Sequence, residues 1–282
     1  MPAEKKEVIS RWTGSAPYWE KHRDIIREMF APVAEALIAE AQIKSGQTVL
    51  DIATGPGEPA LTIAERVGLE GKVVGIDVIP EMAEAARREA HRRGFRNAAF
   101  EVASADRLPF QGSSFDAVVS RFGVMFFPSP VGSVREMLRV LKPGGRIALA
   151  VWHFAERNPF HYAVSKIFER YVDSPPPAPD SPDAFRFAKP GDLLGILSKA
   201  GAAAPSERLL QFSIRASIPV EEFWDLRSEM SDKFRTRLAC LSNEQRAELG
   251  REVVQALRAF SVDDGLSFPA EVLIVSGRKQ PS

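Results

Sequence analysis

The sequence predicts an α/β fold in which a doubly wound, mostly parallel sheet carries helices on both faces. Between residues 48 and 152, short runs of β-forming residues alternate with stretches of helical periodicity. The β-type runs are nearly continuous in apolar residues, as expected of strands that are covered on both faces. Strands that alternate with helices in this way form a parallel sheet joined by right-handed crossovers.

The same patterns place the individual elements of this core. Strands are expected at 48–53, 72–77, 98–103, 115–120 and 146–152. Helices are expected over 81–93 and 131–141, and the proline and two glycines at 143–145 stop the second one. Before the core, residues 12–42 have the pattern of a helix.

The chain after residue 152 has a different texture. Residues 153–190 are rich in phenylalanine and contain the proline-rich stretch 174–182, which predicts a mobile surface loop. A helix is expected over 192–200, where Gly201 ends it. Strict alternation of apolar and polar residues over 210–218 predicts a half-buried strand near a sheet edge.

Two or three helices over about 220–260 come before a last strand at 270–277, so they form a cap inserted into the sheet. We therefore divide the chain into three parts. Residues 1–45 form an N-terminal helical segment that covers the site, and residues 46–153 form the core. Residues 154–282 complete the sheet and carry a helical cap or lid at about 154–190 and 220–260.

The composition limits the class of protein. Thirty-seven basic residues balance 37 acidic ones, so no overall charge attracts nucleic acid or an anionic membrane. The N-terminus lacks the apolar core of a signal peptide, and no apolar run approaches the roughly 20 residues of a membrane helix. The one cysteine, Cys240, belongs to no disulfide or zinc pattern. We expect a cytoplasmic monomer or homodimer with no metal, membrane span or nucleic-acid partner.

A glycine-rich loop follows the first strand. Residues 51–57 read Asp-Ile-Ala-Thr-Gly-Pro-Gly, and a helix begins soon afterwards at Pro59. Glycines let a ligand approach the backbone, and a helix N-terminus offers free N–H groups. Asp77 ends the second strand, 22 residues after Gly55, where an acid accepts hydrogen bonds from both hydroxyls of a ribose. Alone, Asp77 suits a helix cap equally well; beside the loop it indicates a nucleoside cofactor.

Two kinds of nucleoside cofactor compete for this loop. Residues 55–60 fit the G-x-G-x-x-G/A fingerprint of dinucleotides, which is a weak signal by itself. Asp51 and Glu58 flank the loop, and two carboxylates repel a pyrophosphate but suit a ligand that carries an ammonium and a sulfonium. Pro56 also removes an N–H group that a pyrophosphate would use. The residues thus favour a methyl donor over a dinucleotide.

Five motifs in order resemble the class I S-adenosylmethionine-dependent methyltransferases of the ubiquinone/menaquinone-biosynthesis type. They are VLDIATGPG, VVGIDVIPEM, VASADRLPF, SFDAVVSRFGVMFF and REMLRVLKPGGRIALAVW, and they cover residues 48–152. The resemblance is weaker over the N-terminal helix and absent over most of the cap. It implies a seven-stranded, Rossmann-like sheet with an antiparallel last strand, whose core binds S-adenosylmethionine.

The resemblance also implies roles for individual residues. The loop from Ala53 to Gly57 holds the methionine portion, Asp77 the ribose, and neighbouring residues the adenine. The expected cofactor-binding residues are Tyr18, Asp51, Ala53, Thr54, Gly55, Gly57, Asp77, Val78, Met82, Ser104, Ala105, Asp106 and Ser120. Ser120 serves equally well as a turn residue, and Tyr18 as a core residue. The family usually has glycine at position 53 and Asp or Asn at position 104, and we expect binding to survive both differences.

The methyl acceptor is expected to be a small apolar or aromatic molecule. Aromatic residues cluster after the fourth and fifth strands, namely Phe122, Phe126, Phe127, Trp152, Phe154, Phe160 and Phe168. His153 directly follows the fifth strand and is the candidate general base for an acceptor that must lose a proton. The sequence therefore predicts S-adenosylmethionine-dependent methylation of an O, C or N atom. An NAD(P)-dependent oxidoreductase and a non-catalytic S-adenosylmethionine-binding protein are the alternatives.

Overall fold

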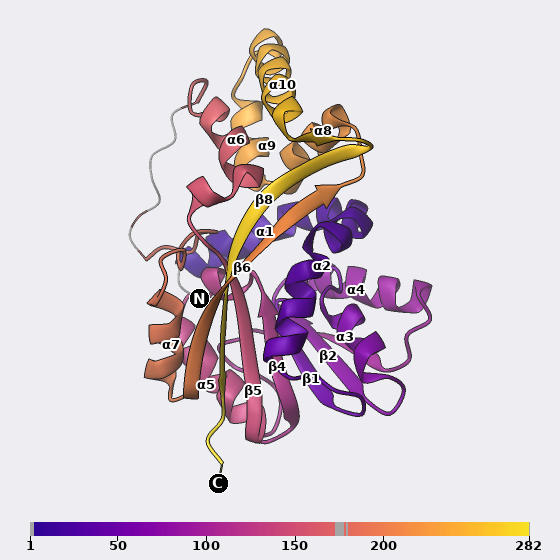
Figure 1. The fold of residues 1–282 in the computed structure, drawn as a ribbon, viewed down its shortest axis with the longest axis vertical. Coiled ribbons are helices and arrows are strands. Elements are labelled where there is room, and N and C mark those ends of the chain that lie inside the picture. The colour runs from indigo at the N-terminus through magenta and orange to yellow at the C-terminus, as the bar shows by residue number, and fades with distance from the viewer. Residues whose placement is uncertain (1–2, 173–177, 179, 282) are drawn as a thin grey trace.

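A twisted sheet forms the centre of the molecule, which the computed structural model describes over residues 3–172, 178 and 180–281. Its strands are β1 (Thr48–Ile52), β2 (Lys72–Asp77), β3 (Ala98–Val102), β4 (Phe115–Arg121), β5 (Leu141–Trp152), β6 (Ala203–Ala216), β7 (Ser261–Val262) and β8 (Gly265–Arg278). The order is β3-β2-β1-β4-β5-β8-β6, and the short β7 pairs with β8 off this path (Figure 1). Strands β1 to β5 are parallel, and β8 is antiparallel to both neighbours. The expected mostly parallel sheet with an antiparallel last strand is confirmed.

Helices cover the sheet and extend beyond one end of it. They are α1 (Ala3–Lys21), α2 (Arg23–Glu40), α3 (Ala60–Val67), α4 (Pro80–Arg92), α5 (Pro130–Val140), α6 (Pro159–Phe168), α7 (Asp192–Ala200), α8 (Val220–Met230), α9 (Asp232–Ala239) and α10 (Asn243–Leu257). Short 3₁₀ turns lie at Val124–Phe126, Ala155–Arg157 and Arg258–Phe260. From β1 the chain winds outward through α3 and α4 to β3, and then through α5 from β4 to β5. Right-handed crossovers therefore place α3 and α4 on one face and α5 on the other.

The sheet is buried on both faces, as its apolar sequence predicts. Val118 and Val119 of β4 and Ile147 of β5 are fully buried, and the helices contribute Leu61 and Met137 to the same core. Each such side chain contributes about 1.5–3 kcal/mol when it leaves water. This packing fixes the positions of the strand ends, where the candidate site lies.

Strand β6 is the edge strand that the alternation over 210–218 predicts, but it begins earlier, at Ala203. Its first half contains no buried residue, so the sequence there shows no apolar alternation, and its register shifts between Ala203 and Ser206. Pro205 lies within this irregular stretch, where an edge strand tolerates a residue that lacks an N–H group.

The N-terminal region consists of two helices and not the single helix expected over 12–42. The helices α1 and α2 separate at His22, because they pack on different surfaces. Ala16 of α1 contacts Ile79 and Met82 near α4, whereas Phe30 of α2 joins the central core. Helix α1 also contacts α8 and α9, so it lies between the core and the cap.

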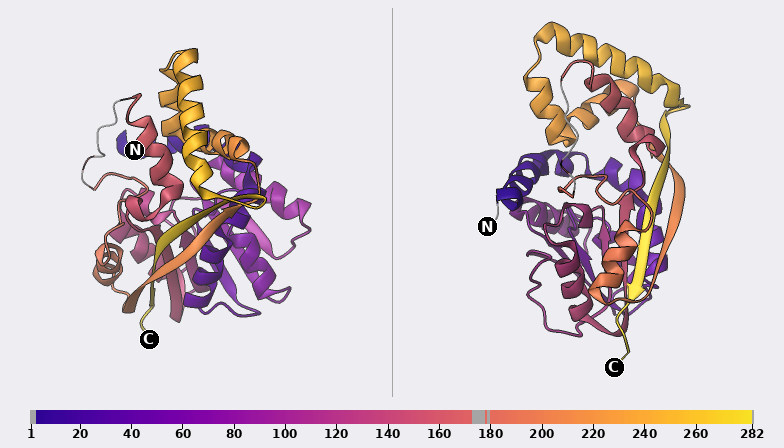
Figure 2. Two further views of the ribbon diagram at one scale, coloured as in Figure 1. Left: turned by 45° about the horizontal axis from the view of Figure 1, so that its top comes forward. Right: turned by 90° about the vertical axis from the view of Figure 1, so that its left-hand side faces the viewer.

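The helices α6, α8, α9 and α10 gather beyond the carboxyl ends of the parallel strands (Figures 1 and 2). The long ribbons of β6 and β8 extend into this group, and α8, α9 and α10 lie between these two strands in the sequence. The predicted proline-rich loop falls largely on residues 174–177 and 179, outside the described residues. In the part of the chain that is described, no helix has the length and apolar character to cross a membrane.

Candidate active site

A cavity of about 250 Å³ lies at the carboxyl ends of the parallel strands. The loop after β1 and the ends of β2 and β4 form its floor, α1 and α2 contribute one wall, and α6 and α8 contribute the cap side. Nine of the predicted cofactor-binding residues line it: Ala53, Thr54, Gly55, Asp77, Val78, Met82, Ser104, Ala105 and Asp106. The structure thus brings together residues from three separate segments of the sequence, 53–55, 77–82 and 104–106.

The loop after β1 has a left-handed backbone at three positions. Gly55 has φ 56° and Gly57 has φ 115°, which glycine adopts at no steric cost. Ala53, where the family usually has glycine, has φ 58° and must carry its methyl group in this conformation. Space for that methyl comes from Gly123, since a Cβ atom there would lie 2.6 Å from Ala53 Cβ. The glycine after β4 therefore compensates for the alanine in the loop.

Asp77 joins the end of β2 to this loop. Its Oδ2 accepts a hydrogen bond from the Gly55 N–H at 2.9 Å, and its Oδ1 accepts one from the Ile79 N–H at 3.0 Å. Burial raises the pKa of Asp77 to about 6, and these backbone donors oppose the shift. Each carboxylate oxygen keeps a further lone pair and the side chain lines the cavity, so Asp77 can still accept from ribose hydroxyls.

Asp51 lies beneath the loop as a buried acid. It is fully buried, and neither carboxylate oxygen has a hydrogen-bond partner among the described residues; the same holds for Thr54 Oγ1. Burial raises the pKa of Asp51 to about 7, although the Thr54 hydroxyl and the Arg121 guanidinium oppose this shift. Such a carboxylate is stabilised by a cation, so the loop fits the ammonium-bearing end of the expected methyl donor and does not fit a pyrophosphate.

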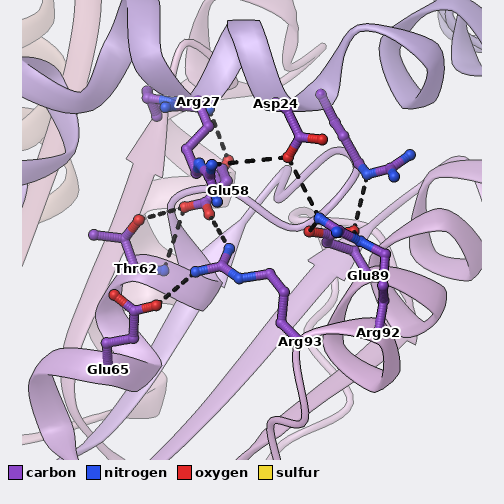
Figure 3. Close-up of polar contacts among 10 residues, drawn as sticks. Asp24, Arg27, Glu58, Thr62, Glu65, Glu89, Arg92 and Arg93 are labelled. Atoms are coloured by element: carbon purple, nitrogen blue, oxygen red, sulfur yellow. Dashed lines mark hydrogen bonds and ion pairs between the residues drawn. The ribbon is translucent and has the colours of Figure 1, made fainter.

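Glu58 does not offer the free charge that the sequence suggested. Its Oε1 accepts from Arg93 at 2.8 Å, and its Oε2 accepts from the Thr62 hydroxyl at 2.6 Å. Figure 3 shows this pair in a group of charged and polar residues from α2, α3 and α4, in which Asp24 of α2 also pairs with Arg92 of α4. The labelled members are Asp24, Arg27, Glu58, Thr62, Glu65, Glu89, Arg92 and Arg93. The repulsion of a pyrophosphate therefore rests on Asp51, and Glu58 serves to hold the loop against α4.

The expected adenine end of the site is apolar with a polar edge. Met82 is buried, and Val78 is exposed. At the edge, Asp106 Oδ1 accepts from the Ser133 hydroxyl at 2.8 Å, and Ser104 Oγ lies 3.3 Å from Asp106 Oδ2. Ser104 and Asp106 thus lie together, and both line the cavity at the expected adenine edge.

Four other predicted residues, like Asp51, do not line the cavity. Ser120 is buried and donates its hydroxyl to the Ile52 carbonyl at 2.8 Å, so it joins β4 to the end of β1. Gly57 packs against α3, where a Cβ atom would lie 3.1 Å from Leu61. The Tyr18 ring lies 4.8 Å from the Arg235 guanidinium. The aromatic residues of α1 that do line the cavity are Trp12 and Trp19.

The fourth, His153, lies at the end of β5 but faces away from the cavity lining. Its Nδ1 is 3.3 Å from Glu271 Oε2 on β8. The residue that takes the expected place is His161 of α6, which lines the cavity. Sequence position alone could not distinguish them, because the turn over 155–157 carries α6 back over the strand ends. The assignment of a general base to His153 gains no support from this geometry.

Aromatic rings form the part of the cavity farther from the loop. Phe122, which follows β4, stacks on Trp152 with ring centres 4.4 Å apart, and Trp152 stacks on Phe160 at 6.3 Å. Phe126 and Phe127 also line the space. Phe154 is exposed and Phe168 is buried against Phe234, so these two do not belong to it. A flat, apolar molecule is the ligand that such stacked rings accommodate best.

Arg227 is a further cavity residue that sequence reasoning missed, as it missed His161. It comes from α8, is 6% exposed, and places its guanidinium 4.1 Å from the Phe160 ring centre. Its Nη2 lies 3.5 Å from His161 Nδ1. Nothing in the sequence of α8 distinguishes Arg227 from a surface arginine, because its burial depends on packing against α6, about 60 residues earlier in the chain.

Comparisons with known proteins match the part of the chain that forms the sheet and the loop. Residues 43–172 match the family described as "Methyltransferase domain". The aklanonic acid methyltransferase DauC of Streptomyces sp. is 37% identical over 144 residues, 51% of this chain and 64% of DauC. The ubiquinone/menaquinone biosynthesis C-methyltransferase UbiE of Coxiella burnetii is 37% identical over 113 residues, 40% of this chain and 45% of UbiE. These matches therefore span between about half and two thirds of the relatives' own lengths.

The fold extends the likeness beyond the matched segment. Phosphoethanolamine N-methyltransferase 2 of Haemonchus contortus, solved in complex with S-adenosyl-L-methionine, superposes with a TM-score of 0.54. The superposition covers 93% of this chain and 57% of that one at 18% identity, which establishes the fold. The glycine loop, Asp77 and the adenine edge lie within the matched residues. Residues 43–172 are thus similar to a methyltransferase domain, and the match to DauC is a second, independent similarity to a methyltransferase.

Proposed function

We propose that this protein methylates a small apolar or aromatic molecule with S-adenosylmethionine as the donor. The observation that carries the proposal is one continuous cavity. It joins the residues expected to hold the donor, such as Asp77 and Gly55, to the stacked rings of Phe122, Trp152 and Phe160. A donor and an acceptor bound in that cavity meet without intervening protein.

When bound, the donor supplies an activated methyl group on a sulfonium. The protein's own residues then have to align two molecules and exclude water, which contributes on the order of 7 kcal/mol in favourable cases. Asp77 fixes the ribose, and the loop over Asp51 fixes the methionine end. Trp12 and Trp19 of α1 close the cavity toward the cap. No residue of the cavity is required as a general base if the acceptor is already nucleophilic.

A panel assay with the intact protein tests the proposal. S-adenosylhomocysteine formation is followed with small phenols, quinols, amines and thiols as acceptors, and Asp77→Ala is the control for donor binding. Calorimetry with S-adenosylmethionine, NAD and NADP separates the alternatives. Tight nicotinamide binding without methyl-donor binding indicates an oxidoreductase. Donor binding without product formation across the panel indicates a non-catalytic binding protein.

We further propose a small-molecule acceptor and not a nucleic acid. The basic residues of α4, which could suggest RNA, are engaged with acids of the same chain. Arg88 pairs with Glu20 at 2.8 Å, and Arg92 pairs with Glu89 at 2.6 Å. A cytoplasmic monomer or homodimer remains our expectation, and light scattering of the purified protein measures the oligomeric state.

A further inference from the structure

Arg227 carries a positive charge in the acceptor part of the cavity without an acid to pair with it. Burial lowers the pKa of Arg227 to about 10, so the guanidinium is still a cation at neutral pH. Its Nε is buried and has no hydrogen-bond partner, and no described carboxylate forms an ion pair with it. A buried cation without a counter-charge is strongly destabilising.

Beside Arg227, His161 provides a second hydrogen-bond donor that has no acceptor among the described residues. An arginine can only donate, so the contact between Arg227 Nη2 and His161 Nδ1 requires that Nδ1 accept. Burial and the Arg227 charge lower the pKa of His161 well below its usual value, so the ring is neutral and its hydrogen is on Nε2. Among the described residues this Nε2 atom also has no hydrogen-bond partner, although it is buried, and both residues line the cavity.

The N–H groups of Arg227 and His161 lie at the end of the cavity opposite the loop that follows β1. The path from Gly123, beside Ala53, to the guanidinium runs through Phe122, Trp152 and Phe160, whose rings lie side by side. The helices that carry Arg227 and His161 belong to the cap, whereas the donor residues belong to the core (Figures 1 and 2). The charge therefore faces the acceptor and not the methyl donor.

We propose that the acceptor carries a carboxylate, which Arg227 and His161 bind at the cap end of the cavity. The inference rests on the proposed function and names the substrate class: an apolar or aromatic carboxylic acid. The guanidinium offers its free Nε–H and a neighbouring N–H in the planar fork that matches a carboxylate, and His161 Nε2–H offers a third donor. The stacked rings accommodate the apolar body of the same molecule.

The test uses a matched pair of probes that differ only in charge, 2-naphthoate and its neutral amide. Binding of each is measured by calorimetry on protein saturated with S-adenosylhomocysteine, for the wild type and Arg227→Met. Arg251→Met, at an exposed position of α10, is the control. We expect the wild type and the control to bind the acid at least about tenfold tighter than the amide, and Arg227→Met to lose this preference.

Equal binding of the two probes to the wild type, or no binding of either, would overturn the inference. An unchanged preference for the acid in Arg227→Met would also overturn it. A fall in S-adenosylhomocysteine affinity in that variant would do the same, because it would assign the guanidinium to the methyl donor. Thermal unfolding shows whether Arg227→Met is folded, and we expect its midpoint to be unchanged or higher because an unpaired charge is removed. Failure of the proposed function is recognised separately, since it appears as absent donor binding in the wild type.

Discussion

Asp51→Asn should make the ligand-free protein more stable at alkaline pH while it weakens donor binding. The wild-type carboxyl is buried without a hydrogen-bond partner, and its pKa rises from 3.8 to about 7 on folding. An acid whose pKa is raised favours the folded state at low pH. That contribution is fully present below pH 3.8 and is lost as the pH rises through about 7.

The size of the effect follows from this pKa change. Three pH units at 1.36 kcal/mol each give roughly 4 kcal/mol against the folded state at pH 8, and about 1.5 kcal/mol at pH 5. Asparagine removes the charge but leaves a buried amide, which costs about 1–3 kcal/mol at every pH. We therefore expect Asp51→Asn to gain roughly 2.5 kcal/mol relative to the wild type between pH 5 and pH 8.

Urea unfolding of both proteins without ligand, at pH 5 and pH 8, measures this difference directly. Calorimetry with S-adenosylhomocysteine supplies the second half of the test. The ligand's ammonium favours ionised Asp51, so wild-type affinity should rise with pH between 6 and 8, and this rise should be absent in the variant. A stability difference that is the same at both pH values would show that Asp51 does not titrate as the structure implies.

Further predictions concern the loop, the ribose and the candidate base. Asp77→Ala should weaken donor binding by about 1–3 kcal/mol in calorimetry, and should also lower the melting temperature, because the Gly55 and Ile79 N–H groups lose their acceptors. Ala53→Gly should raise the free energy of unfolding by up to about 1 kcal/mol, since it relieves a left-handed alanine; unchanged urea stability would contradict this. His153→Gln should leave kcat within about threefold, and a loss of 10²-fold or more would restore its role as the base.

The sequence predicts the core of the fold well because its signals are local. Each parallel strand is a short apolar run, and the five expected strands lie within a residue or two of the observed ones, apart from the earlier start of β5. The prediction of a single N-terminal helix was wrong. No residue pattern in 12–42 predicts a break at His22. The helix breaks there because Ala16 and Phe30 contact different surfaces.

The residues that line the loop end of the cavity were predictable for the same reason, and those that line the cap end were not. A glycine-rich loop and an acid at a strand end can each be recognised within one short stretch of the sequence. The acceptor half is assembled from α1, α6 and α8, which are far apart in the sequence. The position of His153 directly after a strand made it the candidate base, whereas the histidine that lines the cavity is His161. The sequence does not predict this, because the position of α6 depends on the packing of the cap.

The two halves of the cavity share one physical feature. Among the described residues, folding buries an acid without a hydrogen-bond partner beneath the donor loop, Asp51, and a cation without an ion-pair partner at the cap end, Arg227. A domain whose net stability is about 5–15 kcal/mol bears both charges only at a considerable loss. An ammonium at one end and a carboxylate at the other would each restore part of that loss. Ligand binding should therefore stabilise the protein by more than the buried area of the two ligands implies. S-adenosylhomocysteine and 2-naphthoate added together should raise the melting temperature more than either ligand alone, because one would pair with Asp51 and the other with Arg227.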